Sequence, residues 1–437
     1  MISLIVCVDS KFGIAKDDTI PWYISEDLKY FKKNTMNKDI IVGRKTMETL
    51  PKLQGRRLHV ATNNNLTDLL ENLKGKDIVI IGGAQIYKKM IDKCDEIHLT
   101  VIEKDYKCDL FFPKIPESYN LTEYSEREYN DKENCWYRFY KYNNTTNYKS
   151  GEQEYLDICH KILDEGVHRE DRTGTGTVSS FGNKISFDIS KYTPLLTTKR
   201  VAWKSCINEL LWFLRGSTNV KELQEVGCNI WNGNSSMEYK RNNDLGHLLP
   251  EDTGPIYGFN WRHFGAEYDN CYTDYTGKGF DQIEYILNEI KTNPSSRRLV
   301  LSGWNPCVMN KGILPPCHSL CQFYVSDGKL SCQMYQRSAD FFLGVPFNIF
   351  SYGVLTQIIA KKTGLKPDKL IIVFGDTHLY KDHLEQTKRQ ISRQILTKPI
   401  LNLDDSIINK NFKDMTIHDF ELVGYFPYPS IKGVMSV

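Results

Sequence analysis

The stretch Ile313-Leu-Pro-Pro-Cys317-His-Ser-Leu-Cys-Gln-Phe-Tyr324 places one thiol between a Pro-Pro bend and a segment patterned like a β-strand. The expected strand covers residues 321–325, so the rigid bend would hold the sulfur of Cys317 at a fixed place and angle. Only a thiolate attacks an electrophile, and nearby positive charge favours that form. The chain offers three arginines that could supply such charge: Arg297, Arg298 and Arg337. The pattern therefore indicates a nucleophilic cysteine.

Two other interpretations of Cys317 are open on the residues alone. A cysteine is often a small buried hydrophobic residue. Cys317, His318 and Cys321 are also close enough in sequence to suggest zinc ligands. No second Cys/His pair at finger-like spacing accompanies them, so we expect no metal site.

Length and composition predict two or more soluble domains. The 437 residues exceed one ordinary domain, and the hydrophobic share of 41% and charged share of 25% are usual for globular proteins. A net charge of +2 without a Lys/Arg block argues against a dedicated nucleic-acid binder. The twelve cysteines lack a spacing pattern, the first residues lack a basic leader, and no apolar stretch suits a membrane span. We therefore expect a cytoplasmic protein with reduced thiols.

The first domain is expected over residues 1–142, with an α/β fold. Short β-branched runs predict strands at 3–8, 39–42, 58–62, 77–81 and 96–102, and helical patterns fall at 25–34 and 84–93. Antiparallel strands at 121–129 and 135–142 would end a central sheet with flanking helices. Ser25 is expected to cap the first helix. Residues 143–151 are polar and form the expected linker.

The second domain is expected over residues 152–437, with longer helices and aromatic-rich strands in an α+β arrangement. The helix predicted at 202–214 carries an apolar stripe of Ile207, Leu210, Leu211 and Leu214. Glu209 lies inside this helix, where it could also be a partly exposed residue without a special role. A buried carboxylate is costly unless it is hydrogen-bonded or protonated, so we expect a bonded or protonated Glu209.

Residues 152–437 resemble thymidylate synthase in several long motifs that occur in order around Cys317. The motifs are Arg169-Glu-Asp-Arg-Thr-Gly-Thr-Gly-Thr177, Pro194-Leu-Leu-Thr-Thr-Lys-Arg200, Asn208-Glu-Leu-Leu-Trp-Phe213, Gly254-Pro-Ile-Tyr-Gly-Phe-Asn-Trp-Arg-His263, Gln333-Met-Tyr-Gln-Arg-Ser-Ala-Asp340, Leu343-Gly-Val-Pro-Phe-Asn-Ile349 and Gly375-Asp-Thr-His-Leu-Tyr380. The resemblance implies methylation of dUMP by 5,10-methylenetetrahydrofolate through a covalent Cys317 adduct, without a metal. It also implies proton transfers by Glu209 and Tyr257.

The same resemblance implies two sets of binding residues and a homodimer. The dUMP-binding residues would be Arg172, Arg337, Ser338, Asp340, Asn348, His378 and Tyr380, with Arg297 and Arg298 serving the neighbouring subunit's site. The folate-binding residues would be Lys199 near the glutamate tail, Ile230, Trp231, Leu314, Asp340 and Phe347. Asn348 favours dUMP, because an amide matches both O4 and N3–H of uracil, whereas related enzymes acting on dCMP carry aspartate there. Asn232 and Ser436 depart from the family pattern, which has aspartate and often alanine.

In the first domain, the stretch Pro21-Trp-Tyr-Ile-Ser-Glu-Asp-Leu-Lys-Tyr-Phe31 places Asp27 and Phe31 on one helix face. An isolated Asp27 could merely occupy the helix start, where the dipole favours acids. Two glycine-containing stretches run from strand to helix, Val42-Gly-Arg-Lys-Thr46 and Ile80-Ile-Gly-Gly-Ala-Gln-Ile-Tyr87. Helix starts of this kind accept phosphates. In this order and spacing, the stretches make residues 1–142 resemble dihydrofolate reductase.

That resemblance implies reduction of dihydrofolate with NADPH. Asp27 would assist protonation of N5 through a water ordered by Trp22 and Thr100, and residues 13–22 would form a mobile lid. The folate-binding residues would be Ile5, Asp27, Phe31, Leu50, Leu53, Arg56 and Thr100. The cofactor-binding residues would be Cys7, Ile14, Ile20, Gly43, Arg44, Lys45, Thr46, Thr62, Asn63, Gly82, Gly83, Ala84, Gln85, Ile86 and Tyr87. The resemblance also implies a cis peptide bond between Gly82 and Gly83.

Two departures affect the adenosine side of the cofactor site. The region at 63–77 is shorter than the family usually has, so we expect the sheet to lack one edge strand. Gln85 stands where an arginine often lies beside the 2′-phosphate. Both changes bear on the preference for NADPH over NADH.

Together the two resemblances imply a bifunctional enzyme of thymidylate synthesis, in which the second domain makes dihydrofolate and the first reduces it. One alternative is that the first domain binds folate without turnover, which the short region at 63–77 motivates. An RNA-binding role finds no support in the near-neutral charge.

Overall fold

The computed structural model describes residues 1–62, 64–145, 150–171 and 174–435. The chain divides into two compact units. Unit 1 takes in residues 1–148 and 396–398, and unit 2 takes in residues 149–395 and 399–437. Among the described residues, every helix is too short or too polar to span a bilayer.

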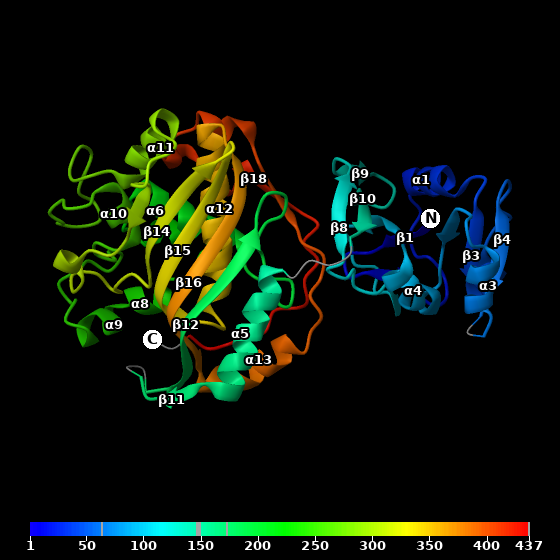
Figure 1. Cartoon of the computed structure of the whole chain (residues 1–437), viewed down its shortest axis with the longest axis horizontal. Coiled ribbons are helices and arrows are strands. Elements are labelled where there is room, and N and C mark those ends of the chain that lie inside the picture. The colour runs from blue at the N-terminus through cyan, green and yellow to red at the C-terminus, as the bar shows by residue number, and fades with distance from the viewer. Residues whose placement is uncertain (63, 146–149, 172–173, 436–437) are drawn as a thin grey trace. The chain divides into compact units, whose positions relative to one another are not determined.

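Unit 1 is built on one mixed sheet with strand order β4-β3-β5-β1-β6-β10-β8, and β9 pairs with β10 (Figure 1). Its strands are β1 (Ile2–Val8), β3 (Asp39–Gly43), β4 (Arg57–Ala61), β5 (Ile78–Ile80), β6 (Glu96–Ile102), β8 (Tyr119–Tyr124), β9 (Glu128–Asn130) and β10 (Cys135–Asn144). Strands β4, β3, β5, β1 and β6 run parallel, whereas β10 is antiparallel to β6, β8 and β9. The parallel part needs crossovers, as the sequence pattern predicted.

Short helices provide most of these crossovers in unit 1. They are α1 (Ser25–Thr35), α2 (Arg44–Thr49), α3 (Leu66–Asn72), α4 (Ala84–Met90) and the 3₁₀ turn η1 (Ile91–Lys93), and a small ribbon pairs β2 (Gly13–Ala15) with β7 (Leu110–Phe111). After β4 the chain enters α3, and within the described residues no strand pairs with the outer edge of β4. The expectation that this region forms no edge strand is thereby confirmed.

Two local predictions in unit 1 were wrong. Ile24 occupies the cap position of α1, and Ser25 is its first helical residue, whose hydroxyl donates to Glu26 instead of capping. The single strand expected at 121–129 is two strands, β8 and β9, because the polar residues 125–127 separate them.

Unit 2 is built on a six-stranded sheet with order β11-β12-β16-β15-β14-β13. Its strands are β11 (Val167–Arg169), β12 (Thr177–Asp188), β13 (Val300–Ser302), β14 (His318–Ser326), β15 (Lys329–Asp340) and β16 (Lys366–Tyr380), and a separate pair joins β17 (Ile400–Leu403) to β18 (Phe420–Val423). Only β15 and β16 pair in parallel within the six-stranded sheet. The strand predicted at 321–325 lies within β14, which begins directly after Cys317.

Helices of unit 2 pack against one face of this sheet. They are α5 (Gly151–Glu165), α6 (Trp203–Arg215), α7 (Lys221–Glu225), α8 (Asn232–Ser235), α9 (Met237–Asn242), α10 (Tyr257–Arg262), α11 (Gln282–Thr292), α12 (Gly344–Thr363) and α13 (Leu384–Ile391), with 3₁₀ turns η2 (Pro306–Val308), η3 (Lys381–His383), η4 (Asp405–Ile408), η5 (Phe412–Asp414) and η6 (Ile417–Asp419). The central helix α12 contacts β15 and β16, and β14, β15 and β16 lie side by side in front of α6 and α12 in Figure 1. The predicted stripe of α6 is buried in this core.

Candidate active sites

Cys317 lies on a bend that is fastened to the neighbouring strand by Arg337. The Arg337 guanidinium, on β15, donates from Nε to the Pro316 carbonyl at 3.0 Å and from Nη2 to the Pro315 carbonyl at 2.8 Å. The same Nη2 lies 4.0 Å from Sγ of Cys317. The planar guanidinium fixes the bend because it donates to two consecutive carbonyls, and its positive charge favours the ionised form of the Cys317 sulfur. The half-buried thiol is thus both positioned and electrostatically supported.

Tyr257 lies against the same bend. The backbone N–H of Cys317 donates to the Tyr257 hydroxyl at 2.7 Å, and burial raises the pKa of that phenol. The ring stacks on His318 with centroids 4.0 Å apart. His318 is buried, its pKa is lowered to about 3 by that burial, and its Nδ1 pairs with the Tyr352 hydroxyl at 2.8 Å. Two neutral rings therefore support the nucleophile, and the described residues contain no cluster of three metal-ligating side chains.

Glu209 is buried in α6, with 8% of its surface exposed, as its place in the sequence predicted. Burial raises the pKa of its carboxyl to about 7, and a hydrogen bond from Trp231 opposes that rise. The Trp231 indole N–H donates to Oε1 at 2.7 Å. A carboxyl with a pKa near neutrality can both give and take a proton at working pH.

The expected phosphate ligands occupy two different places. Arg337 and Ser338 are half-buried on β15 beside the bend. Arg297 and Arg298 are exposed just before the edge strand β13, and within the described residues neither has an ion-pair partner. Arg172 lies outside the described residues.

A second group of polar residues is oriented by neighbours that sequence reasoning did not single out. The Gln336 side-chain amide donates to Oδ1 of Asn348 at 3.0 Å and so fixes the direction of that amide. His378 Nδ1 pairs with Asp376 at 2.9 Å, and the His378 ring lies edge-on to Tyr380 at 5.4 Å. Side-chain alternation in β15 and β16 could have suggested these partners, but their contacts depend on the packed sheet.

Lys199, which the resemblance places near the folate's glutamate tail, lies beside Phe342. Its ammonium donates to the Phe342 carbonyl and lies 3.6 Å from the centre of the Phe342 ring. The side chain is buried, and burial lowers its pKa to about 7. Asp340 caps the same turn by accepting the Phe342 and Leu343 N–H groups at 3.1 and 3.0 Å. Ile230, Leu314 and Phe347 are partly buried and pack against the core cluster that contains Trp231.

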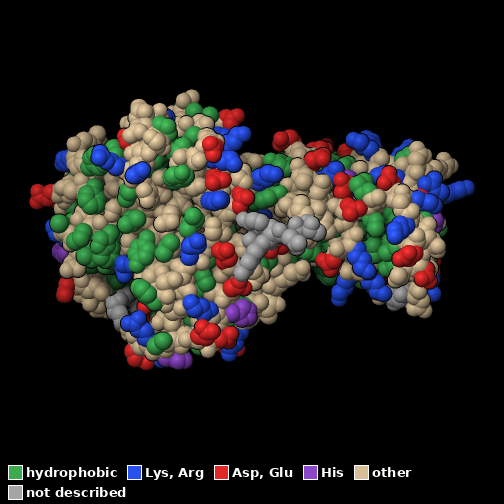
Figure 2. All heavy atoms as spheres, in the orientation of Figure 1, with side chains coloured by type: hydrophobic (Ala, Val, Ile, Leu, Met, Phe, Trp, Pro, Cys, Tyr) green, Lys and Arg blue, Asp and Glu red, His purple; other side chains and the backbone are tan. Residues whose placement is uncertain are grey.

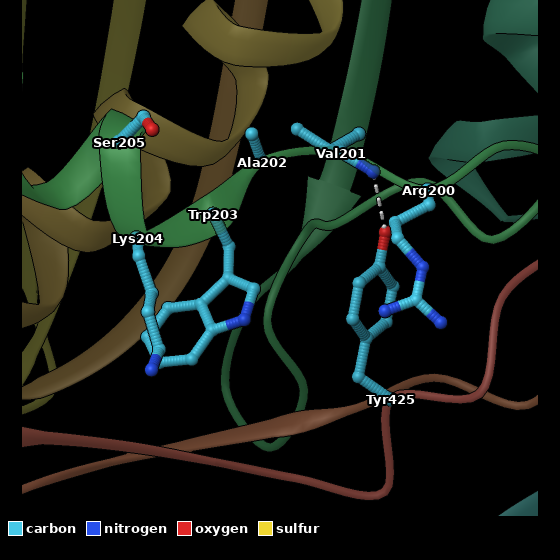
Figure 3. Close-up of a pocket in the computed structure, with 7 residues that line it drawn as sticks. All are labelled: Arg200, Val201, Ala202, Trp203, Lys204, Ser205 and Tyr425. Carbon is cyan, nitrogen blue, oxygen red and sulfur yellow. Dashed lines mark hydrogen bonds between the residues drawn. The ribbon is translucent and has the colours of Figure 1, made fainter. Parts of the chain in front are cut away.

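A small hollow of about 230 Å³ opens beside the start of α6 (Figure 3). Its lining residues are Arg200, Val201, Ala202, Trp203, Lys204, Ser205 and Tyr425. The Lys204 ammonium lies 5.6 Å from the Trp203 ring centre, and the Tyr425 hydroxyl accepts the Val201 N–H at 3.0 Å. No carboxylate is among the lining residues, so the hollow suits an anionic group.

In unit 1, Asp27 faces strands β1 and β6. The Thr100 hydroxyl donates to Oδ1 of Asp27 at 2.6 Å, and Cys7 pairs directly with Thr100 across the two strands. Burial raises the pKa of the Asp27 carboxyl, and hydrogen bonds from Thr100 and Cys7 oppose that rise. Trp22 is buried nearby with its ring 5.2 Å from Tyr106. The site therefore holds one half-buried acid, Asp27 of α1, which faces strands β1 and β6.

The expected folate pocket residues form one apolar cluster. Ile5 is buried in it, and Phe31, Leu50 and Leu53 pack against it from α1 and the segment after α2. The Arg56 guanidinium lies 5.9 Å from the Phe31 ring centre and donates to the Thr35 hydroxyl at 3.1 Å. Within the described residues, no carboxylate pairs with Arg56, so its charge is available to an anion.

The expected cofactor residues meet where two glycine turns touch. The peptide bond between Gly82 and Gly83 is cis, as expected, and the Gly43 N–H donates to the Gly82 carbonyl at 2.7 Å. A Cβ on Gly83 would lie 2.9 Å from the Thr46 hydroxyl, so only glycine allows this approach. The remaining expected residues come from five places: Cys7 from β1, Ile14 from β2, Arg44 and Lys45 from α2, Ala84, Gln85, Ile86 and Tyr87 from α4, and Ile20 and Thr62 from loops.

Two features of this site bear on an anionic cofactor. Arg44, Lys45 and Gln85 are exposed, and within the described residues neither cation has an ion-pair partner. Tyr87 donates its hydroxyl to the Ile5 carbonyl at 2.8 Å and so ties α4 to β1. Asn63 lies outside the described residues. Residues 13–15 of the expected lid form β2, and Ile20 is exposed.

The two units match two protein families. A dihydrofolate reductase model matches residues 1–144, and a thymidylate synthase model matches residues 153–437. A bifunctional dihydrofolate reductase-thymidylate synthase of Paramecium tetraurelia is 41% identical, over 100% of this chain and 98% of the relative. Those of Zea mays and Leishmania major are 39% and 37% identical, over 99% and 100% of this chain and 96% and 95% of their own. The chain therefore belongs to the bifunctional dihydrofolate reductase–thymidylate synthase family.

Proposed function

We propose that Cys317 is the nucleophile with which this chain converts dUMP to dTMP, and that Asp27 is the acid of its dihydrofolate reductase. The chain is a bifunctional enzyme: it methylates dUMP with 5,10-methylenetetrahydrofolate, and it reduces the resulting dihydrofolate with NADPH. We further propose that residues 1–142 carry the reductase, 152–437 the synthase, and 143–151 the link. The assignment of Cys317 rests on the two hydrogen bonds by which the Arg337 guanidinium holds the bend before that residue.

In the proposed synthase reaction, the Cys317 sulfur adds to C6 of uracil and the ring electrons move toward C5 and O4. The C5 carbon then attacks the folate methylene, C5 loses its proton, and the folate leaves as tetrahydrofolate. A hydride from tetrahydrofolate would then reduce the exocyclic methylene to a methyl group as the Cys317 thiolate is expelled, which leaves dTMP and dihydrofolate. Covalent addition divides one difficult substitution into easier steps. Glu209 and Tyr257 would move protons through water, which the pKa of about 7 at Glu209 supports.

We assign the nucleotide's parts to residues of unit 2 by their charge and orientation. Arg172, Arg337 and Ser338 would bind the phosphate, with Arg297 and Arg298 reaching the neighbouring subunit's site. His378 and Tyr380 would bind the ribose, and Asn348 the uracil edge. The bond from Gln336 supports the last assignment, because it fixes which amide atom faces O4 and which faces N3–H.

The folate would lie against Ile230, Trp231, Leu314, Asp340 and Phe347. Lys199 would lie near the glutamate tail of the folate, and the hollow that carries Arg200 and Lys204 offers two further cations for it (Figure 3). Two exposed cations without an acidic neighbour favour carboxylates.

In unit 1, Asp27 would assist the protonation of dihydrofolate, helped by Trp22 and Thr100. Ile5, Phe31, Leu50 and Leu53 would pack the substrate, and Arg56 would bind its glutamate carboxylate. NADPH supplies a hydride when it is bound. Arg44, Lys45 and Thr46 fit its phosphates, because they carry positive charge or a hydroxyl beside glycine turns that leave the backbone accessible.

We also propose that the chain works as a homodimer through unit 2. The uncovered face of the six-stranded sheet supports this, because apolar side chains gathered on an exposed face mark an interaction site. Six such side chains are exposed on its strands: Phe181 (80%), Tyr324 (66%), Val167 (64%), Leu320 (40%), Tyr335 (38%) and Val300 (38%). Figure 2 shows hydrophobic side chains in patches among the charged ones on unit 2. The twelve cysteines form no disulfide with one another, which supports a cytoplasmic location.

Single substitutions test the two assignments separately in the full chain. Cys317→Ala should abolish dTMP formation and leave dihydrofolate reduction unchanged, because it removes only the attacking sulfur. Asp27→Asn should reduce dihydrofolate reduction by on the order of 100-fold or more at neutral pH and leave dTMP formation unchanged. Both activities are followed spectrophotometrically. Loss of both activities from either change would contradict separate sites.

A further inference from the structure

His383 is the most completely buried histidine beside the synthase site that the proposed chemistry does not use. It lies on η3, directly after β16, and its side chain has 0% exposure. Its ring lies 6.0 Å from Tyr380, the proposed ribose ligand, and 5.0 Å from Phe342, whose carbonyl holds Lys199. His383 therefore contacts both the nucleotide side and the folate side of the site.

The third neighbour of His383 is the segment 431–435, called here the tail segment. Nε2 of His383 lies 2.8 Å from the Val434 carbonyl. A carbonyl only accepts, so Nε2 carries the proton and donates. Nδ1 is buried and has no hydrogen-bond partner among the described residues. Leaving Nδ1 of a buried imidazole without a hydrogen-bond partner costs free energy. Among the described residues, the bond from Nε2 to the tail segment is the one hydrogen bond that this side chain makes.

The tail segment has little else to hold it. Val434 and Met435 are 74% and 47% exposed, and only Ile431 is buried. Within the described residues, the bond from His383 is the one hydrogen bond made by residues 431–435. Gly433 packs directly on the imidazole: a Cβ there would lie 2.8 Å from Nε2 and 2.9 Å from the Phe342 ring. His383 therefore packs closely against the tail segment and also makes the hydrogen bond to it.

We propose that His383 is a positioning residue that docks the tail segment beside the folate side of the synthase site. The imidazole joins three elements: the Phe342 turn that Asp340 caps, the end of β16 and the tail segment. Gly433 of the tail segment lies against the Phe342 ring, so docking brings the exposed side chains of Val434 and Met435 toward the proposed folate side, where a bound folate would cover them. The proposal rests on the proposed function of unit 2, and it predicts a larger effect on folate than on dUMP.

Two near-isosteric substitutions separate the hydrogen bond from simple packing. The glutamine amide nitrogen reaches the place of Nε2, whereas the asparagine amide nitrogen reaches only the place of Nδ1. In the full chain, His383→Asn should raise KM for methylenetetrahydrofolate about 3- to 10-fold, the effect of one neutral hydrogen bond. The reductase activity of the same sample should stay unchanged, and KM for dUMP should change less than KM for methylenetetrahydrofolate. His383→Gln should restore KM close to the original value.

Gly433→Ala provides an independent variant, because its methyl group would push the tail segment off the imidazole without touching His383 itself. It should reproduce the KM increase of His383→Asn. His418→Gln, at an exposed histidine of unit 2, is the matched control and should change nothing. Equal KM values for the Asn and Gln variants, or an unchanged KM in both His383→Asn and Gly433→Ala, would overturn the proposal. An unmodified chain that forms no dTMP would instead overturn the proposed function.

Discussion

At the scale of single residues, the two proposed acids are tuned by different surroundings. Glu209 lies in the core of unit 2, where burial raises its pKa to about 7 and only Trp231 opposes the rise. Asp27 is half-buried, and both Thr100 and Cys7 stabilise its ionised form. In both carboxyls burial is the largest cause of the raised pKa, and the hydrogen-bond donors oppose it.

Thr100→Val tests this tuning in the reductase. The Thr100 hydroxyl stabilises the ionised carboxylate, so its loss should raise the pKa of Asp27 further. Since the reaction needs a proton, its rate should fall as pH rises through that pKa. The falling limb of the pH profile of kcat/KM should therefore move to higher pH. Thr49→Val, at an exposed helix position, is the control. A Thr100→Val enzyme whose falling limb stays in place or moves to lower pH would contradict the proposed role of Thr100.

At the scale of elements, the bend before β14 depends on a side chain from β15. Arg337 uses two nitrogens of one planar group to hold two consecutive carbonyls. A lysine keeps the charge but has no fork. The bend that presents the Cys317 sulfur is therefore rigid, because it leads into β14 and is held by a side chain of β15.

Arg337→Lys should lower kcat of the synthase by about 10- to 100-fold, because a small misplacement of the sulfur is costly. Steady-state kinetics with saturating folate measure this. Arg241→Lys, on the exposed side of α9, should have no effect. An Arg337→Lys enzyme with full kcat would show that the bend holds its place without the fork.

The start of α4 bears on the choice of cofactor. Gln85 is exposed there and carries no charge for the 2′-phosphate of NADPH. Gln85→Arg should lower KM for NADPH and leave KM for NADH unchanged, because a guanidinium forks onto phosphate oxygens. Gln224→Arg in unit 2 is the control. Equal changes for both cofactors would mean that residue 85 does not face the 2′-phosphate.

The elements were largely predictable from the sequence, whereas side-chain directions were not. Strand β6 and helices α1 and α6 followed from apolar periodicity, which acts over a few neighbouring residues. The burial of Glu209 followed from its place in the α6 pattern. The inward turn of Lys199, the Gln336–Asn348 pair and the hollow at Arg200 and Lys204 arise from contacts between segments distant in sequence. No local pattern records such contacts.

At the scale of the whole molecule, the chain joins two reactions of which one makes the substrate of the other. The proposed dimer adds a second level of sharing, because Arg297 and Arg298 would serve the site of the neighbouring subunit. Each synthase site would then need residues from two chains.

Mixing two inactive variants tests this sharing. Cys317→Ala chains and Arg297→Ala/Arg298→Ala chains should each lack synthase activity as homodimers. After exchange at equal amounts, random pairing should restore about a quarter of the unmodified activity, since half of the dimers regain one of two sites. Absence of recovery, with subunit exchange confirmed by sedimentation, would mean that the arginines act within their own subunit.

The central claim is that the sulfur of Cys317 bonds to the pyrimidine during turnover. The most direct measurement is mass spectrometry of the full chain, quenched in acid while it converts dUMP with methylenetetrahydrofolate. The account predicts a nucleotide adduct on the peptide that contains Cys317, and none in the Cys317→Ala chain. An adduct on another cysteine, or dTMP formation by the Cys317→Ala chain, would contradict it.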